Sequence, residues 1–424
     1  MWGKEVIDAL KELVYKWDNV QQICDYMILG AVLSSASDIH IEPLTSYVRL
    51  RYRIDGELRE ILEYQNFLHQ WVIARFKILS DLKIDETRIP QDGRISKTID
   101  GKPLDLRLST LPTVHGEKVV MRIVDKSKKI PDLNMLWIEG KNLKLIKAAI
   151  ALPNGIILTS WPTGSGKSTT LYSALTILNE VGVNIMTLED PVENQIDGVN
   201  QSQVKPDIWY TFAYGLRTAL RQDPDIIMVW EMRDKETVDI AIEASLTWHL
   251  VLSTIHTNSA AETITRVLNM WVQPFLIPAS FNIIIAQRLI RRLCQKCKVP
   301  LTVKDIWENM LNNIKHSIGQ TPKDELQLRV WEKLKNPVFY WPNTTSSCEA
   351  CEGLGYKGRV GIYEVLEITS WVKDMILSGQ SAFNINIQAI KDGMISLEQD
   401  GIMKALQWHT SLEEVYAAAK TQNG

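Results

Sequence analysis

The segment from residue 160 to residue 169 has the composition and order of a phosphate-binding loop. It reads Ser-Trp-Pro-Thr-Gly-Ser-Gly-Lys-Ser-Thr, follows the short apolar run 155–159 and precedes a helical pattern over 168–179. At a strand–loop–helix junction of this kind, backbone N–H groups and the helix N-terminus together stabilise a phosphate. We therefore expect a nucleoside triphosphate to be bound by Thr163, Gly164, Ser165, Gly166, Lys167, Ser168 and Thr169.

Two side chains of this loop have distinct expected roles. Lys167 would reach the β- and γ-phosphate oxygens, and the Ser168 hydroxyl would be a ligand of Mg²⁺. The alternative is a Gly-rich turn whose lysine meets no ligand. The loop departs from the pattern G-x-x-x-x-G-K-[ST] at its first position, where Trp161 replaces the glycine that lets the chain turn tightly. We therefore predict weak ATP binding for a chain with this tryptophan.

Acidic residues follow two further apolar runs. Glu231 comes shortly after 226–229, and an acid at the tip of a buried strand beside a phosphate loop can polarise the attacking water and hold the Mg²⁺ shell. An exposed strand-end acid is the alternative. Glu189, Asp190 and Glu193 come after the run 184–188 and could contact metal-bound waters, or equally form a solvated turn.

Two histidines flank the apolar run 250–254. His249 precedes it and His256 follows it. A histidine at a strand end could sense or hydrogen-bond the γ-phosphate, because its charge changes near neutral pH. Taken singly, each is better explained as a structural histidine.

Four of the five cysteines form two C-x-x-C pairs, which are Cys294 with Cys297 and Cys348 with Cys351. Such pairs in a chain without secretory features are typical of zinc ligands rather than disulfides. Four thiolates complete a tetrahedral Zn²⁺ shell and leave no open position, so the expected site is structural. Four unligated thiols are the alternative.

The elements that must position these residues fall into two regions. In the first third, alternating residues predict strands over 47–54, 104–110 and 118–124, a hairpin turn at Asp55–Gly56 and a helix over 67–84. This pattern is typical of an α+β domain. From residue 155 onward, apolar strands alternate with helical stretches, which predicts a parallel sheet covered on both faces. The last segment, 385–420, is helical with a break expected near Gly401.

Composition limits the class of protein. A chain of 424 residues with 45% hydrophobic and 23% charged residues is a folded protein of two or three domains. Its formal net charge of −3 disfavours a nucleic-acid binder that relies on bulk positive charge. We see no apolar run long enough to span a bilayer and no secretory signal, so a cytosolic location is the default.

Further segments complete a specific pattern: ASDIHIEP at 36–43, RYRIDG at 51–56, PQDGR at 90–94, LPTVHGEK at 111–118, LEDPVE at 188–193, LRTALRQDPD at 216–225, HLVLSTIHTN at 249–258, GRVGIYEV at 358–365 and SLEEV at 411–415. Together with the phosphate loop, these motifs resemble the type II secretion and type IV pilus assembly ATPases of the secretion ATPase superfamily. The resemblance runs from about residue 19 to the end of the chain.

The resemblance implies a homo-hexameric motor that hydrolyses Mg-ATP. Glu189 and Asp190 match the family's aspartate box, and His249 and His256 match its histidine box. Arg107 and Arg122 match arginines that reach the γ-phosphate, of the same or a neighbouring subunit. Such a motor would be cytoplasmic, peripheral to the inner membrane and bound to a platform protein of a pilus or secretion system, with no nucleic-acid partner expected. The tetracysteine motif favours assembly or secretion over pilus retraction.

The resemblance also implies a fold and a division of the chain into domains. The expected fold is α/β, with a RecA-like P-loop core, an N-terminal α+β (PAS-like) domain, a small tetracysteine zinc subdomain and a C-terminal helical subdomain. The expected ranges are 1–125 for the N-terminal domain, 126–137 for a linker, 138–290 for the core, 291–360 for the tetracysteine subdomain and 361–424 for the helical subdomain. The family often carries a further N-terminal docking module, so we expect a truncated or naturally short form.

Two other functions stay open at this point. One is a DNA-translocating RecA-like ATPase, against which the near-neutral charge and the lack of a basic, aromatic-rich strip argue. The other is a ring component whose nucleotide site is impaired.

The tryptophan content is anomalous, with fourteen Trp against seven Phe. Several of them stand where the family has, or is expected to have, glycine: Trp161, Trp230 and Trp248, and also Trp137, Trp209, Trp271, Trp341 and Trp408. Glycine at a turn allows a positive φ or a close approach of two backbone segments, and tryptophan favours neither. We hypothesise that the chain is altered from its natural form at these positions, by engineering or by a misassigned residue.

Overall fold

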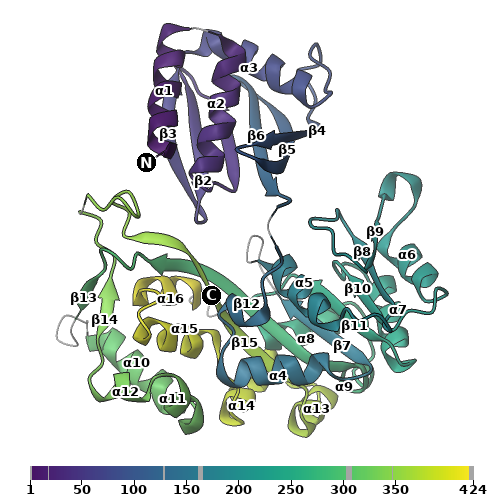
Figure 1. Cartoon of the computed structure of the whole chain (residues 1–424). Helices are drawn as coiled ribbons and strands as arrows, with labels where there is room; N and C mark the ends of the chain where they lie inside the picture. Colours follow the sequence, from purple (N-terminus) through teal and green to yellow (C-terminus); the bar gives the residue numbers. More distant parts are fainter. Residues whose placement is uncertain are drawn as a thin grey trace. The chain divides into compact units, whose positions relative to one another are not determined.

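The computed structural model describes residues 2–17, 19–127, 129–160, 166–301, 308–345 and 347–419. The chain divides into two compact units, an N-terminal unit over 1–129 and a C-terminal unit over 130–424 (Figure 1). None of the helices in the described ranges is long and apolar enough to cross a membrane.

The N-terminal unit is built on a six-stranded antiparallel sheet with the order β3-β2-β1-β6-β5-β4. The expected hairpin turn is confirmed: Asp55 and Gly56 have φ of 50° and 93°, as a two-residue turn that matches the strand twist requires. The strands are β1 (Asp38–Pro43), β2 (Val48–Ile54), β3 (Glu57–Tyr64), β4 (Gln91–Ile99), β5 (Lys102–Thr113) and β6 (Gly116–Asp125).

Three helices pack on one face of this sheet: α1 (Trp2–Lys16), α2 (Val20–Leu33) and α3 (Asn66–Leu79). The core that they share with the sheet includes the fully buried Ile39, Ile41 and Met121. The helix expected over 67–84 was predicted too long, because α3 ends at Leu79 and Asp81 takes a left-handed φ of 55°.

The C-terminal unit contains a seven-stranded sheet with the order β15-β12-β7-β11-β10-β8-β9. Every neighbouring pair is parallel except β12 and β15, so the expected parallel sheet of an α/β fold is confirmed. The strands are β7 (Gly155–Ser160), β8 (Ile185–Glu189), β9 (Asn200–Gln203), β10 (Ile226–Val229), β11 (Leu250–Ile255), β12 (Phe281–Leu293) and β15 (Tyr356–Glu367).

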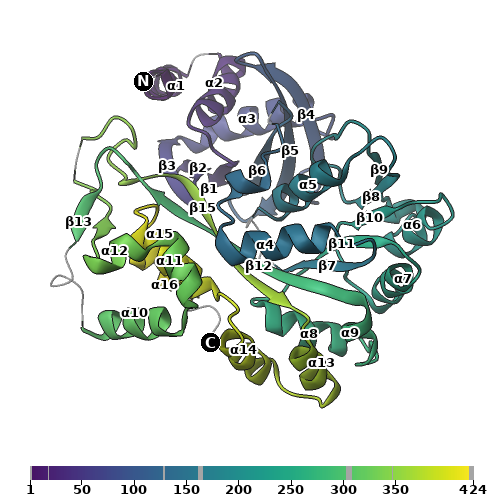
Figure 2. The same cartoon turned by 60° about the horizontal axis from the view of Figure 1, so that its bottom comes forward.

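Helices cover both faces of this sheet, as successive residues of β15 show. Tyr363 donates a hydrogen bond to the Leu136 carbonyl on the side of α4 (Gly140–Ile150), whereas Glu364 accepts from the Ala260 N–H at the start of α8 (Ala260–Asn269). Because successive strand residues point to opposite faces, α4 and α8 lie on opposite sides of the sheet (Figure 2).

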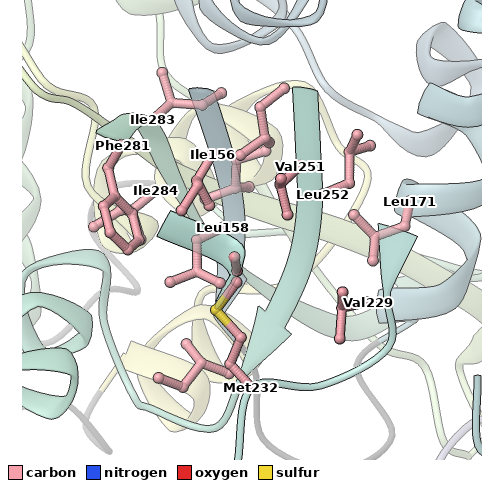
Figure 3. Close-up of a cluster of buried hydrophobic side chains, with 14 of the residues drawn as sticks. Ile156, Leu158, Leu171, Val229, Met232, Val251, Leu252, Phe281, Ile283 and Ile284 are labelled. Carbon is pink, nitrogen blue, oxygen red and sulfur yellow. The ribbon is translucent and has the colours of Figure 1, made fainter. Parts of the chain in front are cut away.

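The strands of this sheet are nearly continuous apolar runs because both of their faces are buried. Side chains such as Ile156 and Leu158 of β7, Val251 of β11 and Ile284 of β12 gather in one cluster (Figure 3). The sheet therefore forms a stiff frame, and residues at the ends of its strands are held in place by it.

The rest of the C-terminal unit is mainly helical. It contains η1 (Leu133–Leu136), α5 (Lys167–Leu178), η2 (Pro206–Ile208), α6 (Phe212–Ala219), α7 (Lys235–Leu246), α9 (Leu276–Ser280), β13 (Val299–Leu301), α10 (Glu308–Gln320), α11 (Lys323–Arg329), α12 (Trp331–Lys335), β14 (Phe339–Trp341), α13 (Ser370–Leu377), α14 (Ala382–Lys391), α15 (Leu397–Leu406) and α16 (Leu412–Ala419).

Three expected boundaries differ from the observed elements. The break expected near Gly401 was wrong, because Gly401 lies inside α15 and the chain turns on either side of that helix. A Cβ at Gly401 would lie 2.6 Å from Val415 Cγ1, so this glycine permits close packing of α15 on α16. The boundaries at 290/291 and 360/361 fall inside β12 and β15, which pair with each other. The finer division into subdomains stays a prediction.

Candidate nucleotide site

Four strands of the C-terminal unit end at one edge of the sheet, which we call the carboxyl edge. Since β7, β8, β10 and β11 are parallel, their carboxyl ends lie on the same side. Glu189 is the last residue of β8, Glu231 follows β10 by two residues and His256 follows β11 directly. The order of strands places α5, which follows β7, beside the same edge.

The described part of the phosphate loop begins at Gly166. Trp161, Thr163, Gly164 and Ser165 lie outside the described residues. Gly166 has φ of 82°, a left-handed conformation that favours glycine, and a Cβ there would lie in tight contact, 3.1 Å from Leu289 Cδ1. Helix α5 starts at Lys167, and its first turn contains the half-buried Ser168 and Thr169.

Glu231 and His256 meet at the carboxyl edge. His256 Nε2 lies 3.2 Å from Glu231 Oε1, and Arg233 Nε donates to Glu231 Oε2 at 2.7 Å. The side chain of Glu231 is about one-tenth exposed, whereas that of His256 is 42% exposed. Each carboxylate oxygen of Glu231 therefore has a partner, and the imidazole of His256 is partly exposed at this edge.

Glu189 is enclosed rather than open. It is fully buried, and its carboxylate accepts hydrogen bonds from Thr187 Oγ1 at 2.5 Å, from Gln201 Nε2 at 2.9 Å and from the Tyr172 hydroxyl. Burial raises the pKa of Glu189, and these donors only partly oppose that effect. The adjacent Asp190 is partly exposed and can reach a ligand more readily.

The structure does not bring His249 to this group. His249 lies at the start of β11, where its Nδ1 is 3.0 Å from the Ala244 carbonyl oxygen. Because β11 has six residues at about 3.3 Å each, the two histidines flanking it stand roughly 20 Å apart. Arg217 of α6 forms a surface ion pair with Glu236 in the first turn of α7.

Sequence reasoning missed two polar residues of β12, Gln287 and Arg288, of which Gln287 approaches the start of α5. Gln287 accepts a hydrogen bond from Thr170 Oγ1 at 2.9 Å and lies 3.4 Å from a Cβ built at Gly166. Arg288 is buried and donates to the Asn258 carbonyl at 2.5 Å. Burial lowers the pKa of Arg288, an effect that nearby Glu364 and Glu262 oppose. The sequence feature that could have indicated them is their position, because Gln287 and Arg288 are a polar pair directly after the apolar run 283–286.

Arg107 and Arg122 lie in the N-terminal unit. They are directly opposite each other on β5 and β6, so both point to the same face of that sheet. The alternating residues Leu106 and Met121 are buried in the core under the helices. The two arginines therefore share the face turned away from the helices.

The four paired cysteines come together at the end of β12 and the start of β15. Their sulfur atoms all lie within 4.8 Å of one another, with Cys294 and Cys348 at 3.9 Å and Cys297 and Cys351 at 3.5 Å. Tetrahedral zinc with Zn–S bonds of about 2.3 Å needs sulfur separations of about 3.8 Å, so the donor set fits Zn²⁺. A backbone N–H of Cys351 lowers the pKa of Cys348 to about 7, which favours the ligating thiolate.

Comparison with known proteins agrees with this geometry. A family model described as "Type II/IV secretion system protein" matches residues 16–417. The type IV pilus assembly ATPase PilB of Myxococcus xanthus is 43% identical over 415 residues, 97% of this chain and 70% of that protein. The type II secretion system protein E of Dickeya dadantii is 42% identical over 401 residues, 95% of this chain and 76% of that protein.

Two solved structures share the fold. The ATPase DotB of Legionella pneumophila has a TM-score of 0.65 at 22% identity and covers 94% of this chain and 95% of its own. The pilus retraction motor PilT, solved with ADP, has a TM-score of 0.58 at 24% identity, with coverages of 93% and 96%. At these identities the likeness concerns the fold alone.

Proposed function

Because the chain belongs to the type II/IV secretion system protein family, we propose that it hydrolyses Mg-ATP to assemble a type IV pilus or the pseudopilus of a type II secretion system. One observation carries this proposal. Glu231 and His256 are in contact at the carboxyl edge, beside the helix that the phosphate loop opens. A carboxylate and an imidazole held together beside a triphosphate can act on the attacking water and on the γ-phosphate.

The phosphates are bound by the loop and the first turn of α5. From the sequence motif, backbone N–H groups of residues 163–169 would bind the β-phosphate, and the Lys167 ammonium would reach the β- and γ-phosphate oxygens. The Ser168 hydroxyl and the partly exposed Asp190 are the groups that would hold Mg²⁺ and its waters. A metal held there would supply positive charge to offset the charge that develops on the phosphate oxygens.

Glu231 positions and polarises the water that attacks the γ-phosphate. Its two partners, Arg233 and His256, fix the direction of the carboxylate. His256 lies between Glu231 and solvent and hydrogen-bonds the γ-phosphate while ATP is present. Loss of the γ-phosphate then removes one contact from His256, which links the hydrolytic state to the end of β11. The buried Glu189 holds the end of β8 and thereby Asp190.

Hydrolysis depends on arginines from the N-terminal unit. Arg107 and Arg122 stabilise charge on the γ-phosphate of their own or a neighbouring subunit, within a homo-hexamer. Because both arginines belong to a different compact unit than the phosphate loop, hydrolysis would be conditional on delivery of the arginines to the γ-phosphate. A conformational change coupled to ATP binding and hydrolysis would then move a bound partner. That partner is a platform protein of the inner membrane, on its cytoplasmic side.

The four cysteines would hold Zn²⁺ in a structural role. The metal would link the end of β12 to the start of β15, and four thiolates leave no position for a reacting ligand.

The test is phosphate release from purified protein with Mg-ATP. We expect Glu231→Gln to lower the rate by about 100-fold or more while ATP binding is retained. The matched control is Glu236→Gln, which removes an exposed carboxylate of α7. Trp161→Gly is measured in parallel, since we expect glycine at this loop position to strengthen ATP binding.

Three results would contradict the proposal. In the first, neither the chain with Trp161 nor Trp161→Gly hydrolyses ATP. In the second, Glu231→Gln and Glu236→Gln lower the hydrolysis rate equally, and in the third, DNA stimulates hydrolysis in a salt-sensitive way. The last of these would favour a DNA translocase.

A further inference from the structure

The sheet of the N-terminal unit carries a row of arginines on the face away from its helices. In that row, Arg53, Arg122, Arg107 and Arg94 belong to four different strands, and one acid, Asp38 of β1, stands between the first two. Residues that are directly opposite one another in neighbouring strands share a face, so these five side chains lie side by side.

Asp38 is buried within this row and accepts hydrogen bonds from its neighbours. It is only 6% exposed, and its Oδ1 accepts a hydrogen bond from Arg122 Nε at 3.0 Å. Its Oδ2 accepts from Ser37 Oγ at 2.8 Å and lies 3.7 Å from Arg53 Nε. Both carboxylate oxygens are therefore engaged, which fixes the orientation of Asp38.

Arg122 is bound through its Nε, while its two terminal nitrogens point away from that contact. Its side chain is 62% exposed although its Nε is bound to a buried carboxylate. Within the described ranges, neither terminal nitrogen of Arg122 has a hydrogen-bond partner. A guanidinium fixed at Nε presents its two Nη groups as a planar fork, which is the geometry that binds two phosphate oxygens.

We propose that Asp38 is a positioning residue that orients Arg122 toward the γ-phosphate of ATP. This inference rests on the proposed function, because it assigns Asp38 a role through Arg122. Without Asp38, the long side chain of Arg122 would sample many rotamers and would have to be ordered in each catalytic cycle. The loss should appear in kcat for ATP hydrolysis more than in KM.

The test uses variants of this 424-residue chain in whichever background, Trp161 or Trp161→Gly, hydrolyses ATP faster. We expect Asp38→Ala to lower kcat by about tenfold. Asp38→Asn keeps the Oδ1 acceptor for Nε and should restore most of the rate. Because Asp38 acts through Arg122, adding Asp38→Ala to Arg122→Ala should cause no further loss.

Glu42→Ala is the matched control. Glu42 lies on the same strand and face, is also 6% exposed, and pairs with Arg49, Arg51 and Lys118 instead. It should leave kcat within about twofold while lowering the unfolding temperature as much as Asp38→Ala does.

Equal kcat losses in the two alanine variants, or a further loss in the Arg122→Ala background, would overturn the role of Asp38. If Arg122→Ala itself hydrolyses ATP normally, the proposed role of Arg122 fails and that of Asp38 fails with it. Absence of hydrolysis in both backgrounds would instead contradict the proposed function.

A second, independent observation concerns the tryptophans. Six of them have left-handed φ between 53° and 70°: Trp17, Trp137, Trp209, Trp248, Trp271 and Trp408. This conformation costs an L-residue with a bulky side chain roughly 1–2 kcal/mol and is the usual place of glycine. Five of the six are among the positions that the sequence singled out. Trp230 and Trp341 have no such φ, and Trp161 lies outside the described residues.

The ends of α15 and α14 have the same hydrogen bonds, but one has tryptophan and the other glycine at the left-handed position. After α15, Trp408 N–H donates to the Ala405 carbonyl and His409 N–H to the Lys404 carbonyl. After α14, Gly393 and Met394 make the same two bonds, to Ile390 and Ala389. This pair of bonds closes a helix through one left-handed residue, for which glycine is strongly preferred. We infer that the protein made in its natural host carries glycine at the six left-handed tryptophan positions.

Peptide masses of the protein isolated from its natural host test this directly, and tryptophan at these positions would overturn it.

Stability gives a second test. Trp248→Gly and Trp408→Gly should each raise the urea concentration at which half of the protein is unfolded. Trp71→Gly, within helix α3, should lower that concentration. Destabilisation by all three substitutions would also contradict the inference.

Discussion

Single residues of this protein take their properties from how deeply the fold buries them. Glu189 ends β8 and Glu231 follows β10 of the same sheet by two residues, yet the first is enclosed by three donors and the second contacts a guanidinium and an imidazole. The same type of side chain can therefore serve as an anchor or as a reactive group, depending on its neighbours. Burial also changes titration, and His409 is the clearest case.

His409 should make the protein less stable in mild acid. Its ring packs 4.6 Å from that of Trp137, and burial lowers its pKa from 6.5 to about 4, with Arg292 and Lys333 acting in the same direction. Between these two pKa values the unfolded chain binds a proton that the folded chain does not. Stability from the neutral histidine is therefore complete above pH 6.5 and is lost as the pH falls toward 4.

The comparison of wild type with His409→Gln at pH 7.5 and pH 5 measures this effect by urea unfolding. We expect the loss of stability between the two pH values to be about 1 kcal/mol smaller in the variant. His316→Gln, on the exposed face of α10, should behave as the wild type does. An identical acid sensitivity of His409→Gln and wild type would disprove the assignment.

At the scale of elements, short contacts join segments that are far apart in the chain. The tetracysteine cluster joins the end of β12 to the start of β15, where Cys294 N–H also donates to the Gly355 carbonyl at 2.9 Å. Packing of α15 on α16 depends in turn on a glycine. Each of these junctions can be tested by one substitution.

Removal of one zinc ligand should open the junction of β12 and β15. We expect the native protein to contain about one Zn²⁺ per chain and Cys348→Ser to contain none, because three thiolates bind the metal far more weakly. The variant should also unfold at a lower temperature. Cys24→Ala, which removes a buried thiol of the other unit, should keep its zinc, and metal analysis of both proteins checks this. A native protein without zinc would contradict the assignment.

Two helical glycines should respond to alanine with opposite signs. Gly401→Ala places a Cβ 2.6 Å from Val415 Cγ1, so we expect a loss of about 1–3 kcal/mol in the free energy of unfolding. Gly319, in α10, has no atom within 4 Å of its built Cβ, so alanine should add about 0.5–1 kcal/mol through helix propensity. Urea unfolding measures both changes, and stabilisation by Gly401→Ala would show that packing at Gly401 is not limiting.

At the scale of the whole molecule, the proposed chemistry is divided between two compact units. The phosphate loop, Glu231 and His256 belong to residues 130–424, and Arg107 and Arg122 belong to residues 1–129. In a ring, arginines from one chain can serve the site of the next. Mixing of inactive variants tests this arrangement.

An equimolar mixture of Glu231→Gln and Arg122→Ala, allowed to exchange subunits, should recover about one quarter of the native ATPase rate. That is the share of interfaces in which an intact Glu231 meets an intact Arg122 from its neighbour. A mixture of Glu231→Gln with Lys167→Ala should recover nothing, because both residues belong to one site. Lack of recovery in the first mixture would show that Arg122 serves its own chain.

The sequence alone determined which local elements exist and where the reactive residues stand on them. Apolar runs marked β7, β8, β10 and β11, and parallel pairing then required Glu189, Glu231 and His256 to share an edge. The C-x-x-C spacing likewise predicted the cysteine cluster before its geometry was known. These inferences succeeded because strand period, helix start and ligand spacing are local properties of the chain.

Tertiary structure alone decided which distant residues meet. It separates His249 from His256 by the length of β11, brings Gln287 to the start of α5, and places Asp38 under Arg122, 84 positions later in the chain. It also makes Gly401 a packing residue rather than a break. Such contacts depend on strand order, register and close packing between segments, and no short stretch of sequence contains that information.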